Sequence, residues 1–130
     1  MTTVLLDTHV IHWWSAEPEK LGRDAVLAIA AADNLAVADI SWFELAWLAR
    51  RERIIVSVPV GSWLRGLAEH VRTVSISVDI AATAAALLSR FPGDPADRLI
   101  FATAVENGWR LVTKDGRLRG YRHARDVVVW

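Results

Sequence analysis

The sequence predicts an α/β protein, a three-layer α/β/α sandwich with a mainly parallel central sheet. Short runs of β-branched and aliphatic residues recur along the chain, and segments with helical periodicity fill the intervals between them. This alternation is typical of parallel strands joined by helices. The length of 130 residues suits one domain, and no repeat or linker divides the chain. We therefore expect a single domain over residues 1–130.

The predicted strands are short apolar runs that end at polar residues or turns. Val4–Leu6 is closed by Asp7, as expected of a buried strand with a polar end. A second strand, Leu35–Ala38, follows Asn34. The remaining candidates are Thr73–Ile76, Arg110–Val112 and, at an edge of the sheet, Val127–Trp130.

The predicted helices carry apolar residues at helical spacing. The first lies within Pro18–Asp33, before the break at Asn34. Another covers Asp97–Asn107, after a loop over Phe91–Pro95, and stops at Gly108, a common helix terminator. Further helices are expected over Ser41–Arg53, Ser62–His70 and Ile80–Ser89.

Composition excludes several classes of protein. The chain has no cysteine, which rules out disulfides, zinc–thiolate sites and thiol nucleophiles. Its 15 basic and 15 acidic residues cancel, so no global field marks it as a polyanion binder. No apolar run approaches the roughly 18 residues needed to cross a membrane, and the N-terminus lacks a basic signal region. We expect a cytoplasmic protein without membrane contact.

Apolar residues are unusually abundant. They make up 53% of the chain without counting glycine, and seven of them are tryptophan, against a typical share of about 45–50%. The surplus indicates either a dense core or apolar surface that a partner chain covers. The segment Trp42–Leu48 is apolar around most of its helical circumference, so it is either wholly buried or partly covered by another chain.

Four acidic residues are expected at one edge of the sheet. Asp7 and Asp115 follow predicted strands, whereas Glu44 and Asp97 lie in the first turns of predicted helices. Functional groups of open parallel sheets gather beyond the carboxyl ends of the strands. Four clustered carboxylates repel one another unless a cation neutralises them. Because the candidate ligands are all oxygen atoms, the pattern favours Mg²⁺ or Mn²⁺.

Local roles also account for these acids. Ser41 and Glu44 have the spacing of a capping box. Asp94 suits the N-cap of the helix whose third residue is Asp97, and an aspartate after a strand is often a turn residue. Capping and metal binding are compatible, since a helix N-terminus favours ionised carboxylates.

The chain resembles the PIN-domain family, and within it the VapC-like ribonuclease toxins of bacterial type II toxin–antitoxin pairs. No single segment is decisive; the ordered set is specific, and it covers essentially the whole chain. The matching segments are Leu5-Leu6-Asp7-Thr8-His9-Val10, Ser41-Trp42-Phe43-Glu44-Leu45, Gly93-Asp94-Pro95-Ala96-Asp97-Arg98-Leu99-Ile100-Phe101-Ala102-Thr103-Ala104, Leu111-Val112-Thr113-Lys114-Asp115 and the closing Val128-Val129-Trp130.

The resemblance implies a three-layer α/β/α fold and endonucleolytic cleavage of RNA that depends on Mg²⁺ or Mn²⁺. As a toxin of this kind, the protein would block translation, form a homodimer and be neutralised by a small antitoxin laid across exposed apolar surface. Matched residue by residue, the family's catalytic and metal-binding acids are Asp7, Glu44, Asp97 and Asp115.

Each site residue has an expected role. Asp7 and Asp97 are the main metal ligands and Asp115 completes the set, while Glu44 binds a second ion or orients the attacking water. Neighbouring side chains are expected to hold these carboxylates in place. They are Ser41, Thr113, which matches the family's hydroxyl two residues before the last acid, and Asp94, which matches less closely.

Cations are expected around the acidic pocket, because RNA must approach it. The stretch Arg110–Arg125 holds six basic residues and, before Asp126, a single acid, Asp115. Alternatively, this basic stretch is an ordinary solvated surface. Arg98 could likewise form a salt bridge to Asp97 instead of contacting RNA. The candidate RNA contacts are Arg98, Lys114, Arg117 and Arg119.

Two other functions fit part of the pattern. A phosphoaspartate receiver is also an α/β domain of this size with an acidic pocket, but only one acid follows the first strand here. A PIN-like module could instead bind RNA or protein without cutting it. The complete set of acids favours the nuclease.

Overall fold

The computed structural model describes residues 1–130 and confirms the α/β/α sandwich. Five strands form one sheet in the order β3-β2-β1-β4-β5, and every neighbouring pair is parallel. The prediction of a mainly parallel sheet is therefore met by a wholly parallel one. The strands are β1 (Thr3–Leu6), β2 (Asn34–Ala38), β3 (Arg72–Val74), β4 (Arg110–Val112) and β5 (Val128–Val129).

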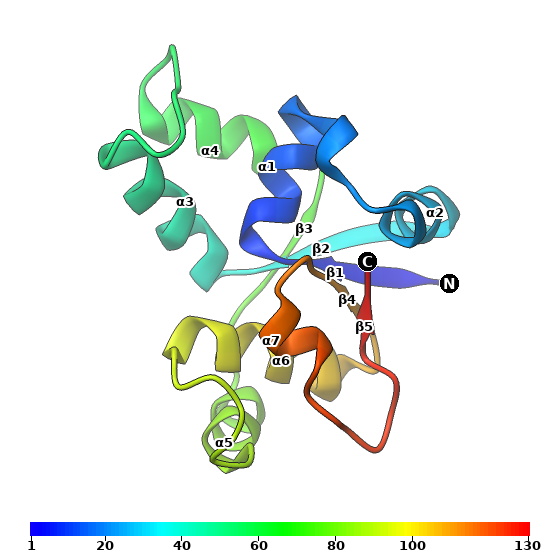
Figure 1. Cartoon of the computed structure of the whole chain (residues 1–130). Coiled ribbons are helices and arrows are strands. Elements are labelled where there is room, and N and C mark those ends of the chain that lie inside the picture. Colours follow the sequence, from blue (N-terminus) through cyan, green and yellow to red (C-terminus); the bar gives the residue numbers. More distant parts are fainter.

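Helices cover both faces of the sheet (Figure 1). On one face lie α1 (Thr8–Ala16), the short 3₁₀ helix η1 (Pro18–Lys20), α2 (Arg23–Ala31), α3 (Ile40–Arg50) and α4 (Val60–Ala68). On the other lie α5 (Val78–Ala86), α6 (Pro95–Asn107) and α7 (Gly116–Arg119). No helix is both long and apolar enough to cross a membrane.

Each face of the sheet has its own hydrophobic core, because successive side chains of a strand point to opposite faces. Val4, Leu6 and Val112 are buried against the layer that contains α1 and α4. Leu5 and Leu111 point to the opposite face and pack in the cluster under α6 and α7. Successive strand residues face opposite sides of a sheet, so a run that is apolar throughout is buried on both.

Two helices were not predicted from the sequence, α1 and α7. The side chain of Asp7 caps α1 by accepting a hydrogen bond from the Thr8 amide, and Val10 and Ile11 are buried beneath it. Its β-branched and aromatic residues have low helix propensity, so burial against the sheet is what makes the segment helical. The predicted helix within Pro18–Asp33 is also divided, into η1 and α2.

Other predicted elements are present with shifted ends. The predicted helix at Asp97 begins at Pro95, because Asp94 caps it, and it ends at Gly108, whose φ of +69° is the left-handed conformation that glycine favours. The helix predicted over Ser41–Arg53 is α3, Ile40–Arg50.

Helix α3 is only partly buried. The alternative that Trp42–Leu48 is wholly buried is therefore wrong. Ser41 and Leu45 are buried, and Trp42 packs against the core. On the outer side, the Phe43 and Trp47 residues are 62% and 50% exposed. The apolar surplus therefore includes surface as well as core.

Candidate active site

The four predicted acids meet at the carboxyl edge of the sheet. Asp7 follows β1, Asp115 caps α7 just after β4, Glu44 lies in the second turn of α3, and Asp97 lies in the first turn of α6. All four line one pocket of about 900 Å³. The expected convergence of these residues is confirmed, and it follows from the parallel arrangement of β1, β2 and β4.

Asp7 lies between two neighbouring strands. Leu6 of β1 is in register with Val112 of β4, so the residues that follow them are brought together. Asp7 Oδ2 accepts a hydrogen bond from the Thr113 hydroxyl at 2.6 Å, and Oδ1 accepts one from the Thr8 amide at 2.8 Å. Thr113 also accepts a bond from the Asp115 amide at 3.1 Å. Despite these donors, burial raises the pKa of the Asp7 carboxyl above its usual value.

Glu44 is held by a hydroxyl pair rather than by a capping box. The Thr8 hydroxyl donates to Glu44 Oε1 and lies 3.0 Å from the Ser41 hydroxyl. A hydroxyl carries one proton, so Ser41 donates to Thr8 when Thr8 donates to Glu44. The predicted capping box is wrong, because α3 begins at Ile40 with Asp39 at its N-cap. Burial raises the pKa of Glu44.

Asp94 and Asp97 share the first turn of α6. Asp94 accepts hydrogen bonds from the amides of Ala96 at 2.8 Å and Asp97 at 3.4 Å, which confirms its predicted capping role. Burial, reinforced by the negative charges of Asp94 and Asp7, raises the pKa of Asp97 to about 7. Burial and neighbouring acids therefore both disfavour the ionised form of Asp97.

Arg117 binds two of the acids directly. Its guanidinium donates to both oxygens of Asp115, at 3.1 and 2.7 Å, and to Asp97 Oδ2 at 3.1 Å. These hydrogen bonds hold the pKa of Asp115 below its usual range. Arg117 therefore faces the acids of its own chain, a contact that was not predicted from the sequence.

The other basic residues predicted to contact RNA do not all line the acidic pocket. Lys114 lines the acidic pocket, with Nζ 5.6 Å from the ring centroid of Trp13. Arg119 instead lines a separate hollow together with Arg122 and Tyr121. The basic stretch is therefore not one rim around the acids, and Arg119 does not join them.

Arg98 has a structural role, and its predicted contact with phosphate is wrong. Its five N–H groups donate to five backbone carbonyls at 3.1–3.3 Å, and the guanidinium carbon lies 5.5 Å from the Phe91 ring centroid. Because a guanidinium has five N–H donors, none is left for a ligand. The alternative salt bridge to Asp97 does not form either. The accepting carbonyls are those of Ala84, Leu87, Leu88, Phe91 and Pro92.

Comparison with known proteins assigns the family. The PIN domain profile matches residues 4–124. The chain belongs to the PIN-domain family. It is 69% identical to Ribonuclease VapC22 of Mycobacterium tuberculosis over 130 residues, the whole of both chains.

Solved structures support the same fold. This PIN domain is similar to a DNA-bound VapBC from Salmonella typhimurium, with a TM-score of 0.73 and 19% identity over 99% of this chain and 98% of that chain. It is also similar to a toxin–antitoxin complex from Klebsiella pneumoniae, with a TM-score of 0.70 and 23% identity over 98% of this chain and 96% of that chain.

The PIN family implies a divalent metal ion, and the donors of this PIN domain fit one in type. Every candidate ligand is a carboxylate oxygen, and burial raises the pKa of Asp7, Glu44 and Asp97, so a bound divalent cation would favour their ionised forms. No three acidic or histidine side chains yet stand within common ligating distance. A divalent ion held by Asp97 and Asp115 would compete with Arg117, which donates hydrogen bonds to both carboxylates.

Thr8 has no role predicted from the sequence, although the structure places its hydroxyl between Ser41 and Glu44. Its position directly after the acid that ends β1 is the signal that could have identified it. The predicted support from Ser41 therefore reaches Glu44 only through Thr8, whereas Thr113 contacts Asp7 directly.

Proposed function

We propose that this PIN domain is a metal-dependent endoribonuclease that hydrolyses phosphodiester bonds of RNA. One observation carries the proposal: four acids from separate parts of the chain line a single open pocket. The 69% identity to a protein named as a ribonuclease supports it. The alternative of a phosphoaspartate receiver is set aside by the family assignment.

The acids would act together on the phosphate. Asp7, Asp97 and Asp115 would hold a divalent ion, Mg²⁺ or Mn²⁺, which when bound lowers the pKa of a water and offsets charge on the phosphate oxygens. Glu44 would orient the attacking water and accept its proton, a role suited to a carboxylate whose pKa burial has raised. Thr8 and Thr113 would keep Glu44 and Asp7 in position.

Lys114 is the RNA contact that we retain beside the acids, because it lines their pocket. Arg117 would contact RNA only after it leaves the carboxylates that it binds in this structure. Asp94 would support the site through the first turn of α6.

The proposal is tested with purified protein and total RNA. We expect new 5′ ends when Mg²⁺ or Mn²⁺ is present, and none when a chelator removes the ion. Asp7→Asn should abolish cleavage while the protein stays folded by circular dichroism. Full activity in a well-folded Asp7→Asn protein would sink the role of Asp7. Specific RNA binding with no cleavage under any metal condition would favour the non-catalytic alternative.

We also propose that the protein is the toxin of a toxin–antitoxin pair, acts in the cytoplasm and blocks translation there. Structural neighbours named as toxin–antitoxin and VapBC complexes support a small protein partner, and the exposed apolar side of α3 is consistent with a homodimer or a bound chain. Growth arrest on expression, absent for Asp7→Asn and relieved by co-expression of the upstream gene, is the expected result. Light scattering of the purified protein tests the homodimer.

A further inference from the structure

Two tryptophans that are distant in the sequence meet beside the acidic pocket. Trp13 lies on α1 and lines that pocket, whereas Trp130 follows β5 and packs against the hydrophobic core on the same side of the sheet. Their ring centroids are 6.0 Å apart, and the rings meet edge to face at an interplanar angle of 61°. Trp130 therefore joins the wall of the pocket to the core.

Trp130 fits against the backbone of the residue that precedes α2. This residue, Gly22, is the N-cap of the helix and has an ordinary φ of −68°, so its backbone conformation does not require glycine. A Cβ atom at Gly22 would lie 2.7 Å from Nε1 of Trp130 and 2.9 Å from the backbone C atom of Trp130, closer than nonbonded atoms approach. The absence of a side chain at Gly22 thus makes room for Trp130.

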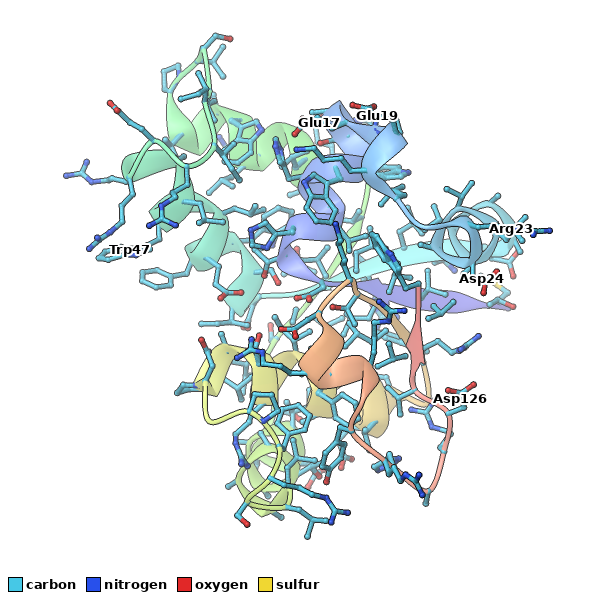
Figure 2. The ribbon with its side chains drawn as sticks, in the orientation of Figure 1. Glu17, Glu19, Arg23, Asp24, Trp47 and Asp126 are labelled. Carbon is cyan, nitrogen blue, oxygen red and sulfur yellow. The ribbon has the colours of Figure 1, made fainter.

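Trp13 also contacts the lysine of the acidic pocket. Nζ of Lys114 lies 5.6 Å from the Trp13 ring centroid, within the range of a cation–π interaction. Lys114 lines the pocket and forms no salt bridge, so its charge is available to a phosphate. A second lysine, Lys20, has Nζ 5.9 Å from the same centroid, but it pairs at 3.1 Å with Glu17. Figure 2 shows Glu17 beside η1, on the side of this layer turned away from the sheet.

The tryptophan pair affects how well Lys114 is ordered before a ligand binds. Lysine has a long flexible stem, and fixing such a side chain on binding costs free energy. Contact with an aromatic ring lowers this cost when the ring is itself fixed. Exposed side chains change rotamer within nanoseconds, so Trp13 holds Lys114 in place only while a neighbour fills the space beside the Trp13 ring. Trp130 is that neighbour.

We propose that Trp130 is a positioning residue of this site: it fixes the ring of Trp13, and Trp13 holds the Lys114 ammonium where it meets a phosphate of the bound RNA. The inference rests on the proposed ribonuclease function and adds a residue that acts on the site through two others. Trp130 does not line the acidic pocket itself. Its substitution therefore reaches RNA only through Trp13 and Lys114.

The first test is a double-mutant cycle on RNA binding. In the Asp7→Asn background with a chelator present, fluorescence anisotropy of a labelled single-stranded RNA gives the Kd. We expect Trp130→Ala to raise the Kd by roughly 2- to 10-fold, the loss that follows when one long side chain is ordered only on binding. In a Lys114→Gln background the same change should have no effect, because no lysine remains to be positioned. Equal losses in both backgrounds would show that Trp130 only packs, and would overturn the proposal.

Salt dependence and kinetics distinguish a misplaced charge from a lost one. Lys114→Gln should reduce the salt dependence of binding by about one unit of slope, whereas Trp130→Ala keeps the charge and should leave the slope unchanged. In the otherwise wild-type enzyme, Trp130→Ala should raise KM and change kcat little. Trp130→Phe retains an aromatic ring and should restore most of the affinity. A lower kcat at constant KM would contradict the positioning role.

A substitution at Gly22 perturbs the same contact from outside the tryptophan pair. Gly22→Ala should raise the Kd as Trp130→Ala does, because the added methyl group displaces Trp130. Gly66→Ala, on α4, is the matched control and should leave the Kd unchanged, since a Cβ atom there meets nothing within 4 Å. Circular dichroism reports whether each variant folds. If Trp130→Ala does not fold, Gly22→Ala takes its place in the cycle with Lys114→Gln.

The outcomes separate this inference from the proposed function. If the wild-type protein cleaves RNA but neither Trp130→Ala nor Gly22→Ala alters Kd or KM, the positioning role is overturned and the ribonuclease stands. The positioning role is also overturned if Trp130→Ala lowers only the free energy of unfolding. If the wild-type protein binds RNA without cleaving it, the proposed function fails while the cycle still tests Trp130. If it neither binds nor cleaves RNA, both proposals are overturned.

Discussion

The Thr113 hydroxyl donates a 2.6 Å hydrogen bond to Asp7, a residue 106 positions away in the sequence. The contact joins the ends of adjacent strands β1 and β4 at the point where the acids gather. Thr113 is completely buried and also accepts a bond from the Asp115 amide. One hydroxyl therefore positions two of the proposed metal ligands.

We expect Thr113→Val to destabilise the protein by about 1–3 kcal/mol, because a buried carboxylate loses its donor while the side chain keeps its shape. Urea unfolding measures this loss. Calorimetric titration should also show weaker binding of Mn²⁺. Thr113→Ser retains the hydroxyl and should restore Mn²⁺ affinity; equal affinities for the Val and Ser variants would contradict the positioning role.

Removing the positive charge of Arg117 should strengthen the binding of a divalent metal ion. Arg117→Gln removes the guanidinium that forms salt bridges with Asp97 and Asp115. We therefore expect Mn²⁺ affinity to rise by about tenfold, which corresponds to roughly 1.4 kcal/mol of binding free energy. The free Mn²⁺ signal in electron paramagnetic resonance measures it. Arg119→Gln, in the same short helix but outside the acidic pocket, is the control. Equal affinities for both variants would show that Arg117 does not compete with the ion.

Asp97 should make the stability of the metal-free protein depend on pH. Its pKa is about 7 in the folded chain against an ordinary value of 3.8, so between these values the folded state binds a proton that the unfolded state has lost. The contribution of this residue to the free energy of unfolding therefore falls as pH rises from about 4 to 7. Urea unfolding in chelator should show a smaller decline for Asp97→Asn than for the wild type; identical pH profiles would refute this.

Arg98 should matter for stability and not for RNA binding. Arg98→Met keeps the apolar stem but removes the donors to five carbonyls, and we expect a loss of about 2–3 kcal/mol in urea unfolding. Arg90→Met, at an exposed arginine nearby in the same loop region, should cost far less. A folded Arg98→Met protein that binds RNA more weakly than the Arg90 variant would restore the phosphate contact that the structure argues against.

Much of the fold and the acidic site could be predicted from local sequence. Apolar runs interrupted by helical patterns specify parallel strands, and parallel strands bring Asp7 and Asp115 to one edge. Asp94 before Pro95 and Gly108 after Asn107 mark the ends of α6 by backbone chemistry alone.

Features that depend on contacts between residues distant in the sequence could not be predicted from the sequence alone. Helix α1 forms because Val10 and Ile11 are buried against the sheet, which its own propensities do not favour. Ser41 contacts Thr8 rather than the backbone of its own helix, because α1 and α3 pack together.

For the basic residues, too, the sequence determined one part of the result and the tertiary structure another. The sequence determined that this chain carries a PIN-type set of acids with arginines close by, but not the direction in which each arginine points. Arg117 and Arg119 are two positions apart on α7, about 200° around the helix axis, so one reaches the acids and the other lines a different hollow. Long side chains have no fixed partner until the packed elements place one within reach.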